Sequence, residues 1–311
     1  MCMKIATRNN LMLKIAHSKI YSHPLPENHR FPMEKYDLIP MKLIVEGSFT
    51  KENFFEPQIL DNEIISITHC QDYLKKLDNL SLTNKESRPI GFPISKELII
   101  REKTIAKGTV DCSLFSIKHG VSMNIAGGTH HAFKDRGEGF CLLNDQAIAA
   151  NFLLANKLVN KIMIIDLDVH QGNGTASLFK NNDHVFTLSF HGKKNFPFKK
   201  EFSDLDVEFD DNTNDEEYLA KLYRLIPKLF NDVNPDFIFY LSGVDVLHTD
   251  KLGRLSLSIE GCKMRDDYII SMCKKNGIPL QISMGGGYSE NIEVITEAHC
   301  NTFRLAKQYF N

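Results

Sequence analysis

The sequence predicts an α/β fold, a mostly parallel sheet with helices on both faces. Short apolar runs alternate with segments whose apolar residues recur at helical spacing, an order typical of strand-helix-strand units. The 311 residues exceed the size of an average domain, but large α/β sheets often reach this length. Because no repeat or low-complexity tract divides the chain, we expect a single domain over residues 1–311.

Five segments fit the description of buried strands, since each is short, apolar and followed by glycine or polar residues. Segments of helical periodicity separate several of them. One, Asp215 to Phe230, has an apolar stripe that includes Leu219 and Leu222, and acidic residues occupy its first turn, where they favour the helix dipole. Residues Tyr21 to Glu46 and Ser81 to Pro93 contain prolines and charges and are expected to be loops over the rim. The expected strands are Val121 to Ile125, Lys161 to Asp168, Val185 to Phe190, Phe237 to Leu241 and Leu280 to Met284, and a second expected helix is Asp145 to Leu158.

The composition argues against several classes of protein. A formal net charge of -2 gives no general attraction to nucleic acid or to an anionic membrane, so neither is an expected partner. The seven cysteines are scattered and never spaced as C-x-x-C, which favours reduced thiols over a disulfide framework. No stretch approaches the roughly 20 apolar residues of a membrane span, and the first residues lack the apolar region of a signal peptide. These features predict a cytoplasmic protein.

Polar or glycine-rich clusters follow four of the expected strands. In parallel α/β sheets ligands bind at the carboxyl ends of the strands, so the four clusters should converge on one crevice. They are Gly127 to His131, Asp166 to His170, Ser242 to Asp245, and Gly285 to Tyr288.

The cluster Asp166 to His170 has the pattern D-x-D-x-H, which would bring its three polar side chains to one side of a strand. Carboxylates and an imidazole crowded together need a cation. A catalytic zinc site uses three such ligands and leaves a position for water, and Asp168, His170 and Asp245 supply that set. The same ligands accept Fe(II). A single Asp at a strand end more often caps a helix, but three such residues favour a metal.

The adjacent pair His130 and His131 follows two glycines. A single histidine beside a turn is usually solvated or hydrogen-bonded. Two in succession, where glycine allows close backbone approach, favour an acid/base pair that divides proton abstraction and donation.

Taken together, these motifs identify a resemblance to the zinc-dependent histone deacetylases, within the arginase/deacetylase superfamily. The sequence is most similar to the class IV branch and its bacterial relatives. The matching segments are His23 to Pro26, His29 to Tyr36, His130 and His131, Asp135 to Cys141, Asp166 to Gly174, Ser242 to Gly253, and Gly285 to Tyr288.

This resemblance implies an eight-stranded parallel sheet, a narrow tunnel for acyl-lysine, and hydrolysis of an amide to an amine and a carboxylate. Asp168, His170 and Asp245 would be the zinc ligands and His130 with His131 the acid/base pair. The phenol of Tyr288 would donate a hydrogen bond to the substrate oxygen, and Asp166 would orient His130. The family also suggests a structural K⁺ near Asp166, Asp168, His170, Ser189 and Phe190.

Three residues resemble the tunnel lining of the family: Gly139, Phe140 and Phe196. Two aromatic rings would admit a slim lysine stem and exclude bulky groups. Because most of the 21 Phe residues should be core, an ordinary packing role is an equal alternative for Phe196.

One position departs from the commonest family pattern. Many members have His-Gly-Asp-Gly after the histidine ligand, and its Asp pairs with the second histidine of the acid/base pair. In this sequence the corresponding residues are Gln171-Gly172-Asn173-Gly174. Asn173 can accept a hydrogen bond from His131 but carries no charge. The class IV branch shares this substitution.

Two other functions stay open at this point. A dimetal ureohydrolase-like enzyme would need further ligands and would leave His130, His131 and Tyr288 without a role. An inactive acyl-lysine binding module would not need every catalytic residue. The expected substrate is an acylated lysine peptide or a small acetylated amine, and class IV resemblance makes long fatty acyl groups worth testing.

Overall fold

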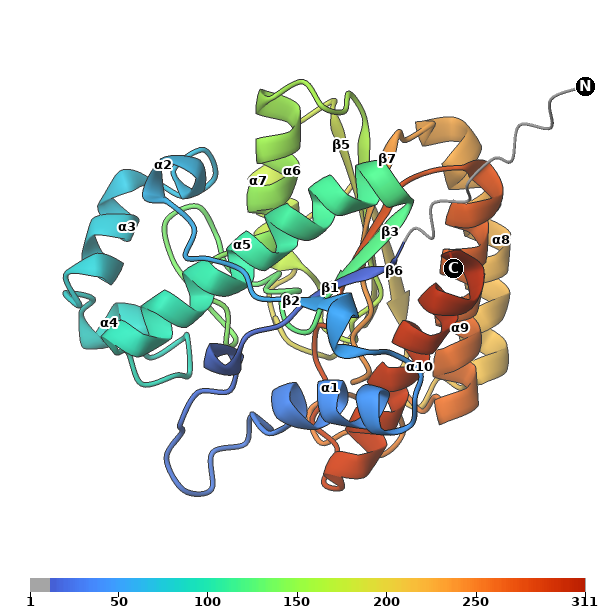
Figure 1. Cartoon of the computed structure of the whole chain (residues 1–311), viewed down its shortest axis with the longest axis horizontal. Helices are drawn as coiled ribbons and strands as arrows, with labels where there is room; N and C mark the ends of the chain where they lie inside the picture. The colour runs from blue at the N-terminus through green and yellow to red at the C-terminus, as the bar shows by residue number, and fades with distance from the viewer. Residues whose placement is uncertain (1–11, 311) are drawn as a thin grey trace, which may run out of the picture.

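The computed structural model describes residues 12–310. They form one eight-stranded sheet in the order β2-β1-β3-β8-β7-β4-β5-β6, in which every pair of neighbouring strands is parallel (Figure 1). The predicted fold class is therefore confirmed, and the sheet is entirely parallel. The prediction of one domain covers residues 1–311, of which residues 1–11 and 311 lie outside the described residues. The strands are β1 (Lys14–Ala16), β2 (Phe54–Phe55), β3 (Val121–Asn124), β4 (Ile162–Asp166), β5 (Val185–Gly192), β6 (Leu205–Phe209), β7 (Phe237–Leu241) and β8 (Leu280–Ser283).

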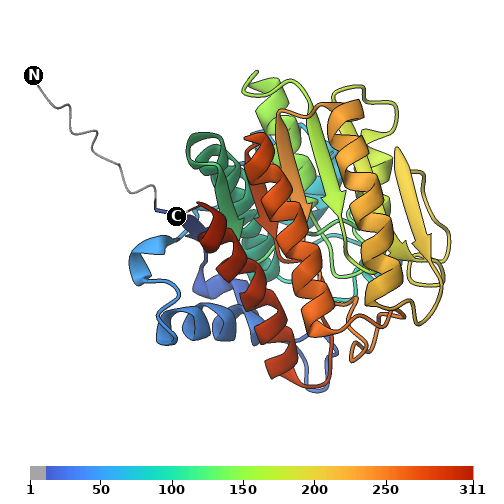
Figure 2. The ribbon, with the colours of Figure 1, turned by 90° about the vertical axis from the view of Figure 1, so that its right-hand side faces the viewer.

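Helices cover both faces of the sheet. Figure 2 shows α8, α9 and α10 side by side across one face, and α5 to α7 lie on the other. Strands buried on both faces need apolar side chains throughout, and all five residues of β7 are buried. The helices are α1 (Lys35–Val45), α2 (Asn62–Ile65), α3 (Gln71–Asp78), α4 (Asn84–Ser87), α5 (Lys96–His119), α6 (Asp145–Ala155), α7 (Asn173–Phe179), α8 (Asp215–Val233), α9 (Ile259–Asn276) and α10 (Ile292–Phe310), with short 3-10 helices η1 (Lys19–Tyr21) and η2 (Lys51–Asn53).

Both segments expected to be loops are partly helical, and Ser81 to Pro93 contains the short helix α4. Residues Tyr21 to Glu46 contain α1, which has Pro40 in its interior. The side chains of Tyr36, Ile39 and Leu43 are buried, and the helix packs against the neighbouring α10. Tertiary packing thus outweighs the helix-breaking tendency of proline.

The strand register brings the ends of the central strands to one level. Asp166, the last residue of β4, lies opposite Leu241 of β7 and Ser189 of β5. Leu241 in turn lies opposite Ser283 of β8, which lies opposite Asn124 of β3. Chain segments that leave these strands therefore start at the same edge of the sheet. None of the helices between residues 12 and 310 has the length and apolar character of a membrane span.

Candidate active site

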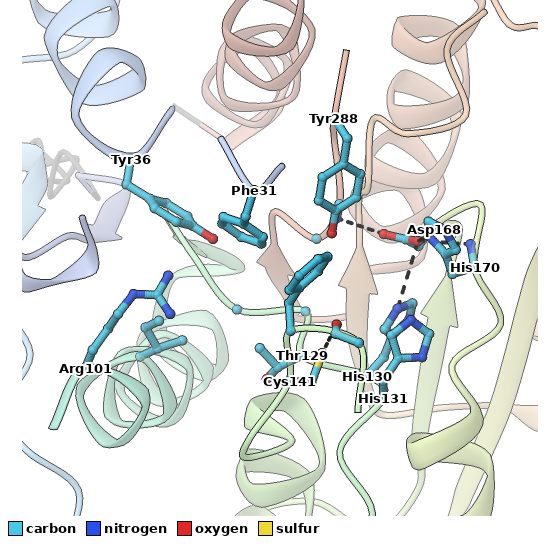
Figure 3. Close-up of a pocket in the computed structure, with 17 residues that line it drawn as sticks. Phe31, Tyr36, Arg101, Thr129, His130, His131, Cys141, Asp168, His170 and Tyr288 are labelled. Atoms are coloured by element: carbon cyan, nitrogen blue, oxygen red, sulfur yellow. Dashed lines mark hydrogen bonds and ion pairs between the residues drawn. The ribbon is translucent and has the colours of Figure 1, made fainter. Parts of the chain in front are cut away.

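The four polar clusters predicted from the sequence converge beyond the carboxyl edge of the sheet. The loop after β3 carries His130 and His131, and the loop after β4 carries Asp168 and His170. The loop after β8 carries Tyr288, whose ring points into the same pocket as both groups (Figure 3). Tyr288 is partly buried and the other four side chains are buried, which keeps water from screening their charges.

Asp168, His170 and Asp245 form a compact buried group. One ligand atom from each lies within 4.8 Å of the others. The Nδ1 of His170 is 3.0 Å from the Oδ1 of Asp168 and 3.0 Å from the Oδ2 of Asp245. The other carboxylate oxygens are fixed by main-chain amides, because Val169 donates to Asp245 (2.9 Å) and Gly286 donates to Asp168 (2.8 Å). The three ligand atoms thus face a common point.

The electrostatics of this group fit a cation. Burial, and after it the nearby negative charge of Asp168, raises the pKa of Asp245 to about 7. Burial opposes a charge on His170, but its hydrogen bonds to the two carboxylates prevail and raise its pKa to about 10. In the protein alone, a proton on His170 supplies the positive charge that the carboxylates require. Two carboxylates and one imidazole are a donor set that zinc accepts.

Close backbone approach at Gly286 makes the group possible. A Cβ atom at this position would overlap the carboxylate oxygen of Asp245 and lie 2.8 Å from that of Asp168. Only glycine leaves room for both acids against the loop after β8.

His130 is paired with a carboxylate. Its Nδ1 donates to the Oδ2 of Asp166 at 2.7 Å, and its Nε2 lies 3.9 Å from the Oδ1 of Asp168. Burial opposes a positive charge on the ring, but the attraction of Asp166 and Asp168 prevails and raises the pKa of His130. Because the other oxygen of Asp166 accepts the amide of Asp168 at 3.1 Å, this carboxylate is fully engaged.

His131 is paired with a neutral amide. Its Nδ1 lies 2.7 Å from the Oδ1 of Asn173, whose Nδ2 points to the Oε2 of Glu138 at 3.4 Å. The acceptor Glu138 fixes the amide orientation, so the oxygen of Asn173 faces the ring and Nδ1 of His131 is the donor. Burial, together with the charges of His130 and His170, lowers the pKa of His131 well below its usual value.

Tyr288 completes the ring of polar groups. Its main-chain N–H donates to Asp250 at 2.6 Å, and Asp250 also accepts the amides of Leu252 and Gly253, each at 2.8 Å. This acid therefore ties the loop after β7 to the loop after β8. Burial, then the charges of Asp168 and Asp245, raises the pKa of the Tyr288 phenol well above its usual value, which keeps it a hydrogen-bond donor.

Two connected cavities lead to this group. An inner cavity of about 40 Å³ lies beside His130 and extends to Arg101. An outer cavity of about 580 Å³ opens at the surface. The two share the lining residues His131, Gly139, Phe140, His170 and Tyr288.

The predicted tunnel residues lie where the cavities meet. Phe140 lines both cavities and Phe196 the outer one, 4.9 Å from the ring of His131. Phe140 has φ 68°, a backbone conformation rare for a bulky residue. It is held there because its amide donates to Ile90 at 2.7 Å and that of Gly139 donates to Pro89 at 2.9 Å. Such strain is typical of functional positions.

Sequence reasoning gave no role to two buried cations near the site. Arg265 of α9 donates to the carbonyls of Leu167 (3.0 Å) and Gly243 (2.7 Å), one in each loop that carries an acidic ligand. Lys35 of α1 donates to the carbonyl of Gly285 at 3.2 Å, and its ammonium lies 5.8 Å from the centre of the Tyr288 ring. Burial lowers the pKa of Lys35 to about 8 against the attraction of nearby carboxylates. Lys35 lies within the matching segment His29 to Tyr36, whereas no local pattern distinguishes Arg265 from a surface cation.

The fold and the site together define a class: an α/β fold with an entirely parallel eight-stranded sheet and an Asp-His-Asp group, able to bind a metal, beside paired histidines. Residues 29–303 match the Histone deacetylase domain family. The chain belongs to the histone deacetylase family, within the arginase/deacetylase superfamily, as its motifs predict.

Relatives and solved structures agree with this assignment. The chain is 39% identical over 290 residues to an uncharacterized protein of Picosynechococcus sp., covering 93% of this chain and 97% of that protein. It is 27% identical over 274 residues to Histone deacetylase 2 of Arabidopsis thaliana, covering 85% and 70%. It resembles the crystal structure of an HDAC homolog complexed with SAHA (TM-score 0.83, 23% identity, 95% and 84% covered) and that of the HDA15 HD domain (TM-score 0.79, 18% identity, 96% and 90% covered). The two structures establish the likeness in fold.

Proposed function

We propose that this protein is a metal-dependent amidohydrolase that removes the acyl group from the side-chain amine of an acylated lysine. Family membership supports a deacetylase, and hence a hydrolase. The observation that carries the proposal is the buried group of Asp168, His170 and Asp245, of which Asp168 lines the inner cavity and His170 lines both cavities. The matched structure of an HDAC homolog with SAHA supports a site that accepts slim acyl-lysine-like ligands.

Asp168, His170 and Asp245 would hold the metal, with zinc preferred and Fe(II) an alternative. When bound, the ion would polarise the amide carbonyl and acidify the attacking water. A structural K⁺ near Asp166 and Ser189, which are paired in the sheet, belongs to the same proposal.

His131 acts as the base in the proposed reaction. Its pKa is lowered and Nδ1 donates to Asn173, so the free lone pair lies on Nε2 and can accept a proton from water. His130, whose pKa is raised by Asp166, contributes positive charge and donates a proton. The phenol of Tyr288 donates a hydrogen bond to the substrate oxygen as negative charge develops there. Gly139, Phe140 and Phe196 would admit the lysine stem.

The alternative of a dimetal ureohydrolase-like enzyme receives little support. Across residues 12–310 one cluster of three potential metal ligands is found, and it is the group already described. Asp166, the nearest further carboxylate, is occupied by His130 and by the amide of Asp168. An inactive binding module would not require the proton-transfer pairs.

The proposal is tested by assaying purified protein with an acetyl-lysine peptide while measuring bound metal. We expect about one divalent ion per chain, and loss of both metal and turnover in Asp168→Ala and Asp245→Ala. The exposed Asp72 of α3 provides a matched control, because Asp72→Ala removes a carboxylate far from the cavities. Full activity in rigorously metal-free protein would exclude the mechanism, and metal binding without turnover would favour the binding module.

A further inference from the structure

The opening of the outer cavity is lined by basic side chains and by no carboxylate. This is not a consequence of composition, because the whole chain has 37 basic and 39 acidic residues. All five basic residues are exposed to solvent at the mouth. They are Arg30, Arg88, Lys194, Lys251 and Arg254.

Nearby acids neutralise only part of this charge. Asp211 lies 3.4 Å from Lys194 and 3.2 Å from Arg254, so one carboxylate serves two cations. Glu290 lies 3.6 Å from Lys251. Each of these pairs is exposed and therefore weak.

Two of the cations have no such partner. Within the part of the chain that the structure describes, neither Arg30 nor Arg88 takes part in an ion pair. The guanidinium of Arg30 lies 5.5 Å from the centre of the Phe140 ring, at the entrance to the tunnel. Glu138, whose neighbour Gly139 donates its amide to Pro89 next to Arg88, is already paired with Arg136. The mouth therefore keeps an excess of positive charge facing solvent.

We propose that the preferred substrate is an acylated lysine within an acidic stretch of polypeptide. The inference rests on the proposed function and adds the class of substrate. Acylation removes the charge of the lysine itself, so the charges that reach the mouth are those of the neighbouring residues. Acidic neighbours complement the rim, whereas a lysine-rich or arginine-rich tail meets like charges.

The arrangement of the cations favours a polypeptide over a small acylated amine. They come from four segments around the opening: the loop before α1, the loop after α4, the loop after β5 and the loop after β7. A chain lying across the mouth can place flanking side chains over several of these segments at once. Phe198, with 91% of its surface exposed beside the same cavity, offers that chain an apolar contact.

A set of acetyl-lysine peptides of equal length tests the inference. The flanking residues are Glu and Asp in one, Gln and Asn in the second, and Lys and Arg in the third. At about 0.01 M salt we expect kcat/KM to fall about 10-fold from the acidic to the neutral peptide and further to the basic one. The differences in kcat/KM between the peptides should shrink at about 0.15 M salt, because salt screens the charges. They should lie mainly in KM, because the flanking charges act on binding.

Variants assign the effect to the rim. In the double variant Arg30→Gln with Arg88→Gln, the kcat/KM for the acidic peptide divided by that for the neutral peptide should approach one. Using Arg88→Glu in place of Arg88→Gln should lower this ratio further. The ratio is measured within each variant, so a general loss of activity does not affect it. Arg224→Gln with Lys228→Gln removes the same charge from exposed positions on α8 that line neither cavity, and should keep the preference.

The outcomes separate this inference from the proposed function. If none of the peptides is hydrolysed, the proposed function itself fails. If the neutral peptide is hydrolysed and the three rates are equal, or the basic peptide is best, the inference is overturned while the deacylase stands. Faster hydrolysis of small acetylated amines than of any peptide would also overturn it.

Discussion

The Nδ1 of His131 donates a hydrogen bond to the side-chain oxygen of Asn173 across 2.7 Å. The adjacent imidazole of His130 makes the corresponding bond to a carboxylate, that of Asp166, over the same 2.7 Å. An amide partner adds no negative charge, whereas a carboxylate favours the imidazolium. The two neighbouring histidines are thus held in different protonation states, with the pKa of His131 lowered and that of His130 raised.

Replacing Asn173 with Asp should change the pH dependence of catalysis. A carboxylate beside Nδ1 would raise the pKa of His131, and a base must be neutral to act, so the acidic limb of the kcat/KM profile should move to higher pH. Movement of the basic limb would instead assign His131 as an acid. Because the two histidines are close, the measured values belong to the pair. If neither limb moves in a folded, active variant, the contact has no part in catalysis.

Tyr288→Phe should separate substrate turnover from inhibitor binding. The change keeps the ring and removes only the donor proposed to stabilise the developing oxyanion. We expect kcat to fall on the order of 100-fold, while a hydroxamate still binds. Steady-state kinetics and inhibitor titration of the same preparation measure both effects. Unchanged turnover would make Tyr288 a packing residue.

The central strands were predictable because their signal is local. An apolar run such as Phe237 to Leu241, followed by a polar cluster, specifies both a buried strand and the edge at which it ends. The outer strands lack this signal. Phe54–Phe55 is two residues long, and Leu205–Phe209 alternates apolar and acidic residues at the edge of the sheet.

The supporting groups of the site were not predictable, because each acts across a long stretch of sequence. Arg265 stands in a helix of ordinary composition, and only the fold brings it to the carbonyls of Leu167 and Gly243. Lys35 is 250 residues from the carbonyl that it contacts. Spacing of residue types along the chain contains no information about such contacts.

The inner cavity predicts a preference for short acyl groups. This cavity has a volume of about 40 Å³. Phe31, Tyr36 and Ile105 line it and do not line the outer cavity. A water-sized probe alone needs roughly 10–15 Å³, so an acetyl group fits but a fatty chain does not. Across peptides of graded acyl length, rates should fall at least about 10-fold between acetyl and octanoyl.

A variant of the inner wall provides the matched test of acyl length. Ile105→Val removes one methylene at a modest cost of about 0.5–1.5 kcal/mol in stability, and it should shift the preferred acyl group by about one carbon. Faster hydrolysis of myristoyl than of acetyl peptide would contradict the cavity argument and favour the fatty acyl specificity suggested by class IV resemblance.

Metal affinity should depend steeply on pH. In the metal-free protein the pKa of His170 is raised to about 10, so near neutral pH a metal must displace a proton from this ligand. The apparent affinity should therefore rise about 10-fold per pH unit between pH 7 and pH 9. The raised pKa of Asp245 should steepen the dependence as the pH falls toward 7. Competition with a chelator at several pH values measures this, and a pH-independent Kd would contradict the assignment.

His69 should make folding stability sensitive to acid. Its Nδ1 lies 2.8 Å from the carbonyl of Phe133, and its Nε2 accepts the amide of Asn144 at 3.0 Å, so the ring bridges the segment after His131 to the start of α6. One nitrogen donates and the other accepts, which only the neutral ring can do. Burial lowers the pKa of His69 to about 4.

The direction of the effect follows from proton linkage. An unfolded histidine has a pKa of about 6.5, so between pH 6.5 and 4 the unfolded chain binds a proton that the folded chain does not. This contribution is present above pH 6.5 and is lost as the pH falls, by about 2 kcal/mol between pH 7 and pH 5. Urea unfolding at pH 7 and at pH 5 measures how far the free energy of unfolding falls with pH. This fall should be about 2 kcal/mol smaller in His69→Gln than in the parent protein, although the variant is less stable at pH 7. The exposed His184 serves as the control, since His184→Gln should keep the parent's drop. An equal drop in His69→Gln would mean that His69 is already protonated in the folded protein.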